Sequence, residues 1–275
     1  MRIVVFSDLD GTLLDHRTYS FEAAKPALRL LKDSNIPLVL VSSKTASELW
    51  SIREELDNEH PFVCENGSVV FVPESLSDYA ASIFNSTSRV INGYFGYYRG
   101  ANRSDILAAL SEVKEKFKFT GFSEWTAKEI ADVTGLPLDA AELAADRMAT
   151  EPIIWRDADD LFKEFSEYLT SVNLRVIRGG RFYHVMGRCD KGDAVREIIR
   201  LYERAFSDRI HSIGLGDGPN DLEMLRAVDA PILMPDISGK YLDDSSLEHV
   251  LLSQKSAPEG WNEMVNQAID VLVDE

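Results

Sequence analysis

A short apolar run at residues 3–6 leads almost directly into the motif DLDGT at residues 8–12. A run of this length and composition is typical of a strand buried on both faces of a parallel sheet. Open α/β sheets bind their ligands at the carboxyl ends of such strands. The placement predicts that Asp8 and Asp10 lie at a ligand-binding edge, where carboxylates suit a hard cation.

Apolar runs and amphipathic patterns alternate along most of the chain, which predicts an α/β fold with a doubly wound parallel-sheet core. Strands are expected at about 3–7, 37–41, 62–64, 68–71, 209–215 and 229–234. Helices are expected at about 21–34, 45–56, 190–205, beyond residue 221 and at 261–273. The block between the two halves breaks this rhythm. We expect a core at 1–84 and 187–275 and an inserted α+β cap domain at 85–186, with strands near 152–155 and 174–177.

The 275-residue chain has a formal net charge of −17, which argues against a nucleic-acid or acidic-membrane partner because phosphate surfaces bind clustered Lys and Arg. A small anionic substrate stays compatible, because salt screens exposed charges beyond about 8–10 Å. The sequence shows no secretory signal pattern and no apolar run of the ~20 residues that a membrane span needs. Cys64 and Cys189 are too few and too far apart for a disulfide framework, which predicts a cytoplasmic protein with reduced thiols. Nothing in the sequence indicates an oligomeric state.

Five polar residues stand at related places in the predicted fold. Asp8 and Ser42 end the first two strands, Asp217 and Asp221 follow the strand at 209–215, and Lys191 opens the helix after the insert. Because carboxyl ends of parallel strands share one edge, these side chains are expected to converge on one crevice. Each residue alone also fits a turn, a helix cap or a surface lysine. Together they match what metal-assisted phosphoryl transfer needs.

In this order the motifs resemble those of the haloacid dehalogenase superfamily of phosphatases, and the insert resembles the large α/β (C2B-type) cap of that superfamily. The resemblance covers essentially the whole chain. Further segments resemble the mannosyl-3-phosphoglycerate phosphatases within the superfamily, namely residues 41–45, 65–67, 151–152 and 179–184.

The resemblance implies that Asp8 is the nucleophile and forms an aspartyl-phosphate, which water then hydrolyses. Asp10 would protonate the leaving oxygen and later deprotonate the water. In an extended chain Asp8 and Asp10, two residues apart, point to the same side, as this role requires. The implied cofactor is Mg²⁺, held by a carboxylate oxygen of Asp8, the backbone carbonyl of Asp10, and Asp217, with Asp221 in support. Ser42 and Lys191 would hold the phosphoryl oxygens.

The resemblance implies a small phosphorylated substrate, mannosyl-3-phosphoglycerate, whose leaving group carries a carboxylate and a sugar. The residues expected to contact it are Ser43, Lys44, Asn66, Arg178, Arg181 and His184. Arg suits a carboxylate because its planar fork binds two oxygens. Arg178 and Arg181 equally fit exposed edge or turn positions, and the stretch around Asn66 fits a hairpin turn. Lys44 stands where many relatives with this cap carry arginine, and it fits either a substrate contact or an ion pair with an acid. Arg147 and Glu151 fit an ion pair within the cap.

Three other functions compete with this interpretation. One is another sugar-phosphate phosphatase, acting on glucosyl-3-phosphoglycerate, sucrose phosphate or a hexose phosphate. A second is a phosphomannomutase-like phosphotransferase, which shares the core and cap type. The third is a receiver-like signalling domain or a sugar-binding protein with an inactive site. It fits poorly, because a receiver is about half this length and lacks a cap, and because Asp8, Asp10 and Asp217 are all present.

Overall fold

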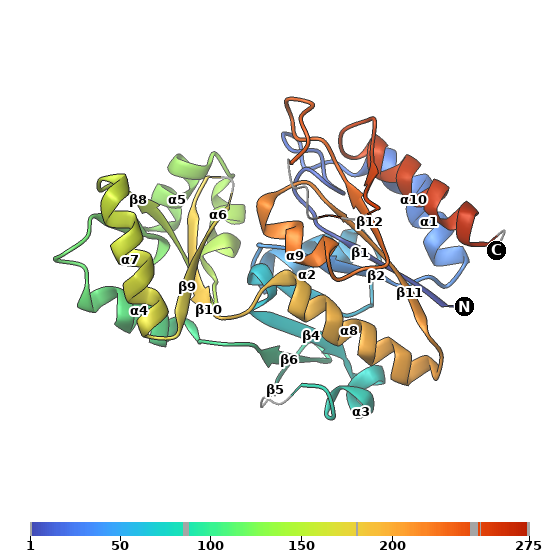
Figure 1. Cartoon of the computed structure of the whole chain (residues 1–275), viewed down its shortest axis with the longest axis horizontal. Helices are drawn as coiled ribbons and strands as arrows, with labels where there is room; N and C mark the ends of the chain where they lie inside the picture. The colour runs from blue at the N-terminus through green and yellow to red at the C-terminus, as the bar shows by residue number, and fades with distance from the viewer. Residues whose placement is uncertain (1, 85–87, 180, 243–246, 248, 274–275) are drawn as a thin grey trace.

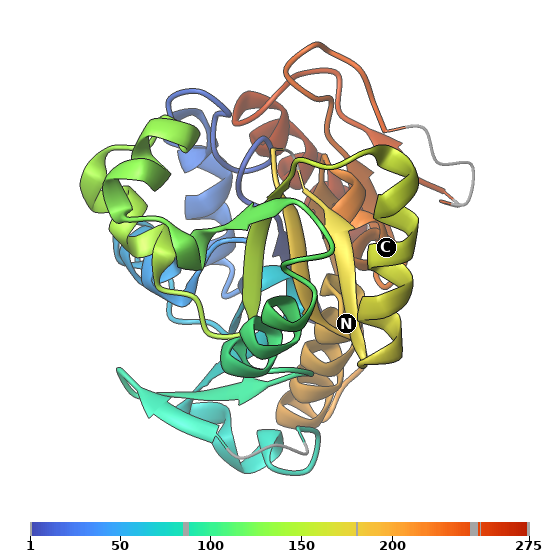
Figure 2. The same cartoon turned by 90° about the vertical axis from the view of Figure 1, so that its left-hand side faces the viewer.

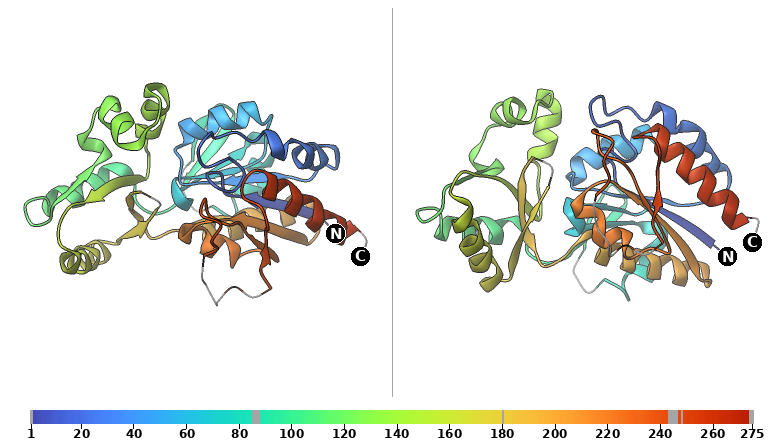
Figure 3. Two further views of the ribbon diagram at one scale, coloured as in Figure 1. Left: turned by 90° about the horizontal axis from the view of Figure 1, so that it is seen from above. Right: turned by 45° about the horizontal axis from the view of Figure 1, so that its top comes forward.

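The computed structural model of the chain describes residues 2–84, 88–179, 181–242, 247 and 249–273, which form a core and a smaller cap, each built on its own sheet (Figure 1). Figure 3 shows the two units from two further directions. Residues 85–87, where the insert is expected to begin, and Gly180 of the motif at 179–184 lie outside the described residues.

The core sheet has nine strands in the order β13-β12-β11-β1-β2-β3-β4-β6-β5. Its parallel part consists of β13 (Leu251–Leu252), β12 (Ala230–Leu233), β11 (Ile210–Gly216), β1 (Arg2–Ser7), β2 (Leu38–Val41) and β3 (Phe62–Cys64). An antiparallel extension follows, made of β4 (Val69–Pro73), β6 (Tyr94–Tyr98) and β5 (Ser88–Ile91). The predicted parallel α/β core is therefore confirmed, with an antiparallel edge added.

Helices cover both faces of this sheet, because successive residues of a buried strand point to opposite sides. Val5 packs in one core cluster, and Val4 and Phe6 pack in the other. The helices of the first face are α1 (Lys25–Asp33), preceded by the 3₁₀ turn η1 (Glu22–Ala24), α2 (Ala46–Glu55) and α10 (Glu259–Val273). Those of the second are α3 (Ser77–Ala80), α8 (Lys191–Phe206) and α9 (Leu222–Leu225). Within the described residues, no helix combines the length and apolar character of a membrane span.

The hairpin of β5 and β6 lies inside the range 85–186 that is expected for the insert, yet β6 pairs with β4 of the core sheet. The second sheet begins only with β7. We therefore propose that the cap starts after β6, near Arg99, and ends near Gly187 at the end of β10.

The cap is built on a four-stranded antiparallel sheet in the order β7-β8-β10-β9. Its strands are β7 (Phe119–Gly121), β8 (Thr150–Trp155), β10 (Tyr183–Gly187) and β9 (Leu174–Arg178). The helices α4 (Arg103–Glu112) and α7 (Asp159–Ser171) pack on the sheet face turned away from the core (Figures 1 and 2). Val185 points to these helices, so its neighbour His184 points to the opposite face, toward the core. A second cluster, with α5 (Ala127–Thr134) and α6 (Leu138–Ala145), completes the cap.

The turn at Glu65–Gly67 connects the core loops to one another. Glu65, Asn66 and Gly67 have φ of 50°, 58° and 95°, a run of left-handed conformations that is uncommon for residues other than glycine. The backbone N–H of Asn66 donates to the carbonyl of Ser42 at 2.9 Å, and that of Glu65 donates to the carbonyl of Lys44 at 2.9 Å. The turn thus fixes the loop that follows β2.

Gly67 also lies against the first turn of α8. A Cβ at Gly67 would lie 2.1 Å from the backbone oxygen of Asp190, the residue that caps this helix. No side chain fits there, because the obstacle is backbone. The close approach of Gly67 to Asp190 places the residue that follows, Lys191.

Gly67→Ala should lower the free energy of unfolding by at least about 3 kcal/mol, measured by urea unfolding. The positive φ accounts for about 1–2 kcal/mol, and the clash with the Asp190 carbonyl accounts for the rest. Gly93→Ala is the matched control, because Gly93 has φ +77° and nothing within 4 Å of its added Cβ. It should cost only about 1 kcal/mol. Equal losses in the two variants would show that the contact with α8 is unimportant.

Candidate active site

Three carboxylates meet at the carboxyl ends of two neighbouring strands. Asp8 follows β1, and Asp217 and Asp221 follow β11; oxygens of all three lie within 4.8 Å of one another. The backbone N–H of Asp8 donates to the Leu215 carbonyl at 3.0 Å and so continues the β1–β11 pairing. Asp8 is 6% exposed and Asp221 is fully buried. The structure therefore brings together the three carboxylates predicted to hold a metal.

Lys191, the first residue of α8, is buried beneath this cluster. Its Nζ donates to Asp8 Oδ1 at 2.7 Å and to Asp221 Oδ1 at 2.6 Å. Burial alone would lower the pKa of Lys191, but the Asp221 and Asp8 carboxylates keep that pKa above its usual value. The ammonium therefore stays charged and holds Asp8 in one orientation through Oδ1.

The pKa values of two of the carboxyls are raised. Burial, followed by the charge of Asp221, raises the pKa of Asp8 to about 7. Burial and the charges of Asp221 and Asp8 raise the pKa of Asp217 to about 8. Three carboxylates beside one ammonium leave an excess of negative charge in a largely buried place, where water screens it weakly. A divalent cation relieves this repulsion, and its preferred ligands are carboxylate oxygens.

Backbone contacts hold the cluster in place. Asp221 Oδ2 accepts hydrogen bonds from the backbone N–H groups of Asp217 at 3.1 Å and Gly218 at 2.9 Å. Thr12 Oγ1 donates to Asp217 Oδ1 at 3.3 Å. Gly11 has φ +80°, and a Cβ there would lie 2.6 Å from Asp217 Oδ2. These contacts fix the carboxylates that could hold a divalent cation. The close approach of Asp217 explains why the DLDGT motif has glycine at residue 11.

Asp10 does not join the three carboxylates through its side chain. Its Oδ2 lies 3.0 Å from Lys44 Nζ, which also lies 3.7 Å from Glu48 Oε1 and 4.9 Å from the centre of the Tyr19 ring. Burial alone would lower the pKa of Lys44, but Asp10 and Glu48 keep that pKa above its usual value. Lys44 thus forms an ion pair with an acid, one of its two predicted roles. Asp10 Oδ1 is buried without a hydrogen-bond partner among the described residues.

Ser42 and Asn66 are both buried and do not line the cavity described below. Ser42 is 1% exposed, and its Oγ accepts a hydrogen bond from the backbone N–H of Lys44 at 3.2 Å. Asn66 is 2% exposed, and its Oδ1 accepts from Asn220 Nδ2 at 3.2 Å. Asn220 lines the cavity described next. Asn66 therefore links the turn at Glu65–Gly67 to the loop that carries Asp217.

A cavity of about 1400 Å³ separates the carboxylates from the cap. Its wall is formed from both units, with Asp8, Asp10, Ser43, Lys44 and Asp217 on the core side and Phe122, Arg147, Arg181, Phe182 and His184 on the cap side. The volume exceeds that of most small-molecule sites, about 300–1,000 Å³. A ligand held by the carboxylate cluster would therefore also contact the cap.

The three predicted cap contacts lie in different surroundings. His184 is buried in the wall, and its Nδ1 has no partner among the residues that the structure describes. Burial and the charges of Arg147 and Lys191 lower the pKa of His184 to about 3, so its imidazole is neutral at pH 7. Arg181 is exposed and donates to the carbonyls of Val133 and Thr134 at the end of α5. The wall formed by the described residues does not include Arg178, which is exposed on β9.

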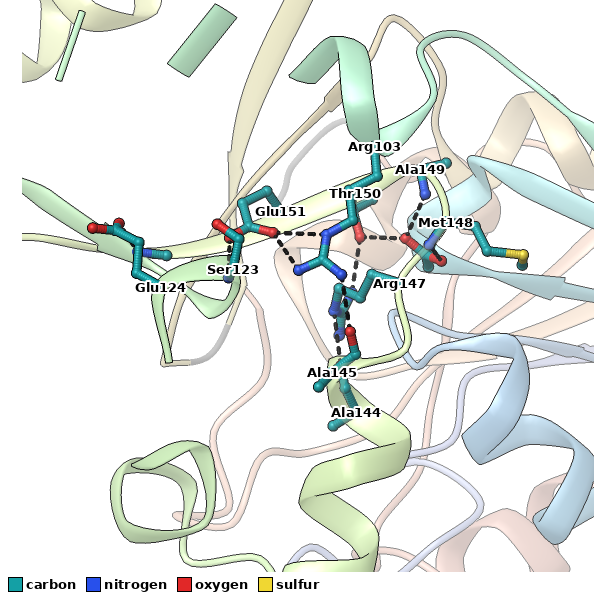
Figure 4. Close-up of polar contacts among 12 residues, drawn as sticks. Arg103, Ser123, Glu124, Ala144, Ala145, Arg147, Met148, Ala149, Thr150 and Glu151 are labelled. Carbon is teal, nitrogen blue, oxygen red and sulfur yellow. Dashed lines mark hydrogen bonds and ion pairs between the residues drawn. The ribbon is translucent and has the colours of Figure 1, made fainter. Parts of the chain in front are cut away.

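The predicted ion pair between Arg147 and Glu151 is wrong (Figure 4). Glu151 is fully buried and pairs with Arg103 Nη2 at 2.9 Å. Arg147 instead donates through Nη1 to Thr150 Oγ1 at 2.9 Å and to the carbonyl of Ser43 at 3.3 Å. Glu151 lies in β8, where its side chain is turned toward Arg103. Arg147 was therefore not predicted as a cavity residue. Thr150 and Glu151 are neighbours in β8, so their side chains point to opposite faces of the sheet.

Comparison with known proteins agrees with this geometry. Residues 5–90 match the family model of haloacid dehalogenase-like hydrolases. A glucosyl-3-phosphoglycerate/mannosyl-3-phosphoglycerate phosphatase of Persephonella marina is 40% identical over 264 residues, covering 96% of this chain and 96% of the relative. The protein of the same name from Methanococcoides burtonii is 37% identical over 271 residues, covering 98% of each.

Solved structures show the same fold at much lower sequence identity. A Thermoplasma acidophilum protein covers 97% of this chain and 98% of its own with a TM-score of 0.67 and 16% identity. A haloacid dehalogenase superfamily phosphatase of Bacteroides thetaiotaomicron covers 97% and 95% with a TM-score of 0.67 and 16% identity. The two full-length relatives decide the family. The chain belongs to the glucosyl-3-phosphoglycerate/mannosyl-3-phosphoglycerate phosphatases of the haloacid dehalogenase superfamily.

Proposed function

We propose that the chain is a Mg²⁺-dependent phosphatase that converts mannosyl-3-phosphoglycerate to mannosylglycerate and phosphate, and that it also accepts the glucosyl compound. The observation that carries the proposal is the buried Asp8–Lys191–Asp221 arrangement beneath a cavity that the core and the cap both line. The names of the two full-length relatives support both sugars. The two buried free thiols, Cys64 and Cys189, support a cytoplasmic location as part of the proposal.

The proposed reaction uses the roles of Asp8 and Asp10 that the resemblance to the superfamily implies. Asp8 attacks phosphorus, the bond from phosphorus to the leaving oxygen breaks, and Asp10 gives that oxygen a proton. Water then attacks the aspartyl-phosphate, Asp10 takes the proton, and inorganic phosphate leaves. Lys44 holds Asp10 through Oδ2, while the buried Oδ1 has no protein partner among the described residues. This arrangement leaves one oxygen of Asp10 for proton transfer.

Charge at the site also fits an anionic substrate. The residues that would hold Mg²⁺ are Asp8, Asp217 and Asp221, with the backbone carbonyl of Asp10. The bound ion supplies the positive charge that lets a carboxylate approach a phosphate. Lys191 adds a fixed positive charge beside Asp8. The expected contacts of Lys191 and Ser42 with phosphoryl oxygens stay predictions from the resemblance, because both side chains are buried.

The proposal is tested by Mg²⁺-dependent phosphate release from mannosyl- and glucosyl-3-phosphoglycerate, sucrose phosphate, mannose phosphates and an aryl phosphate. The two phosphoglycerate conjugates should have a kcat/KM at least about tenfold above that of the others, or about 1.4 kcal/mol in transition-state binding. A flat profile would keep the phosphatase chemistry and reject the substrate class. Failure to release phosphate from any of them would reject the phosphatase function.

Asp8→Asn should abolish phosphate release, because the amide cannot act as the nucleophile, and Asp10→Asn should reduce kcat by at least about 10²–10⁴-fold. Stopped assays of phosphate release check both variants, and circular dichroism checks that they fold. Asp15→Asn serves as a control because Asp15 is partly exposed and accepts hydrogen bonds within its own loop. Near-normal turnover in Asp8→Asn would disprove the nucleophile assignment.

Mg²⁺ affinity should rise with pH. The pKa values of Asp8 and Asp217 are raised to about 7 and about 8, so both carboxyls carry protons at pH 6 that the cation must displace. Calorimetric titration should show affinity at least about tenfold higher at pH 8.5 than at pH 6, with the rise ending above about pH 8. Asp217→Asn should weaken binding and flatten this dependence. Equal affinity of the wild type at both pH values would contradict the proposed ligand set.

A further inference from the structure

Arg147 lies where the cap meets the core, between α6 and β8. Its Nε donates to the Ala144 carbonyl at 3.2 Å, and its Nη1 donates to Thr150 Oγ1 at 2.9 Å and to the Ser43 carbonyl at 3.3 Å. Ser43 belongs to the core and follows Ser42 at the end of β2. Acceptors from both units therefore fix Nε and Nη1 (Figure 4). Among the described residues, Nη2 forms no hydrogen bond or ion pair, and it is available to a ligand.

A chain of hydrogen bonds determines which group donates in the contact between Arg147 and Thr150. Thr150 Oγ1 donates its single proton to Glu65 Oε2 at 2.6 Å, so a lone pair of that hydroxyl faces Arg147. Glu65 is a fully buried core residue, and its carboxylate also accepts from the backbone N–H groups of Met148 at 2.7 Å and Ala149 at 3.1 Å. Arg147 is thus positioned by a segment of the cap that is itself bonded to the core.

No acid contacts Arg147 directly among the described residues: Thr150 Oγ1 separates it from the buried Glu65 carboxylate, and its guanidinium lies 5.7 Å from the centre of the Phe122 ring. Arg147 is half-buried in the cavity wall, and no carboxylate of the described residues forms an ion pair with it. The other cavity cations differ: Lys44 is already paired with two acids, Arg181 is exposed and bonded to carbonyls, and Arg17 and Lys240 lie on exposed loops. An anion bound in the cavity would give Arg147 the direct ionic partner that it lacks among the described residues.

We propose that Arg147 binds the carboxylate of the glycerate leaving group and so determines specificity for phosphoglycerate conjugates. This inference rests on the proposed function. With Nε and Nη1 already bonded, Nη2 can donate a charge-assisted hydrogen bond to a carboxylate oxygen. The contact depends on the cap lying against the core, because Ser43 and Glu65 position Arg147 and its neighbour Thr150. Arg147, rather than Arg178 or Arg181, then recognises the carboxylate.

The test compares two substrates in wild type and Arg147→Met. One is glucosyl-3-phosphoglycerate, and the other is the matched compound in which CH₂OH replaces the carboxylate. Arg147→Met should lower kcat/KM about 30- to 100-fold for the first and less than about threefold for the second, because only the first loses a charge-assisted contact. Arg147→Lys should give an intermediate loss, since it keeps the charge but not the fork. Arg156→Met removes an exposed cap arginine and should change neither value by more than about twofold.

A second variant tests the inference if Arg147→Met does not fold. Thr150→Val removes the hydroxyl that orients Arg147 and should reduce the preference for the carboxylate substrate about threefold to tenfold. Equal losses on both substrates in Arg147→Met would overturn the inference and assign Arg147 a structural role. A carboxylate-specific loss in Arg181→Met, with none in Arg147→Met, would also overturn it. Wild-type protein that hydrolyses neither compound would instead reject the proposed function.

Discussion

The active site depends on a buried ammonium shared by two carboxylates. Lys191 Nζ lies 2.7 Å from Asp8 Oδ1 and 2.6 Å from Asp221 Oδ1, and removing either carboxylate would leave the buried ammonium less well compensated. Several features of the core serve this contact: the parallel pairing of β1 with β11 places the acids, and Gly67 lets the start of α8 approach. One ammonium does not balance three carboxylates, so the remaining negative charge favours a divalent cation.

The core of the site was predictable because parallel strands impose a shared edge. Asp8 and Asp217 are far apart in sequence, yet each follows an apolar strand, and β1 and β11 are neighbours in the sheet. The start of the helix at Asp190 and Lys191 was also predictable from the sequence, because Asp is a common N-cap residue. In the structure the Asp190 side chain accepts a hydrogen bond from the backbone N–H of Asp193 at 2.8 Å. Here local pattern and a general rule of α/β folds were sufficient.

The contacts of the cap were not predictable in the same way, because they depend on how two sheets meet. In sequence, Glu65 fits a hairpin turn. Only the structure shows that its φ is 50° and that its carboxylate accepts a hydrogen bond from Thr150 of the cap. Arg147 and Glu151 have a spacing that fits a local pair, but Arg103, 48 residues away from Glu151, satisfies that acid instead. Long-range partners of this kind leave no periodic signal.

The position of the cap follows from more than its two chain connections. Thr45 Oγ1 donates to the Leu143 carbonyl at 2.8 Å, close to where the Glu65 carboxylate receives its three cap donors. Pulling these groups apart would leave a buried carboxylate without donors, which costs far more than breaking a solvated contact. The α6–β8 junction is therefore the part of the cap most firmly joined to the core. A residue on this junction is tied to the core by hydrogen bonds, which makes it a better place for recognising a leaving group than the exposed loop that carries Arg181.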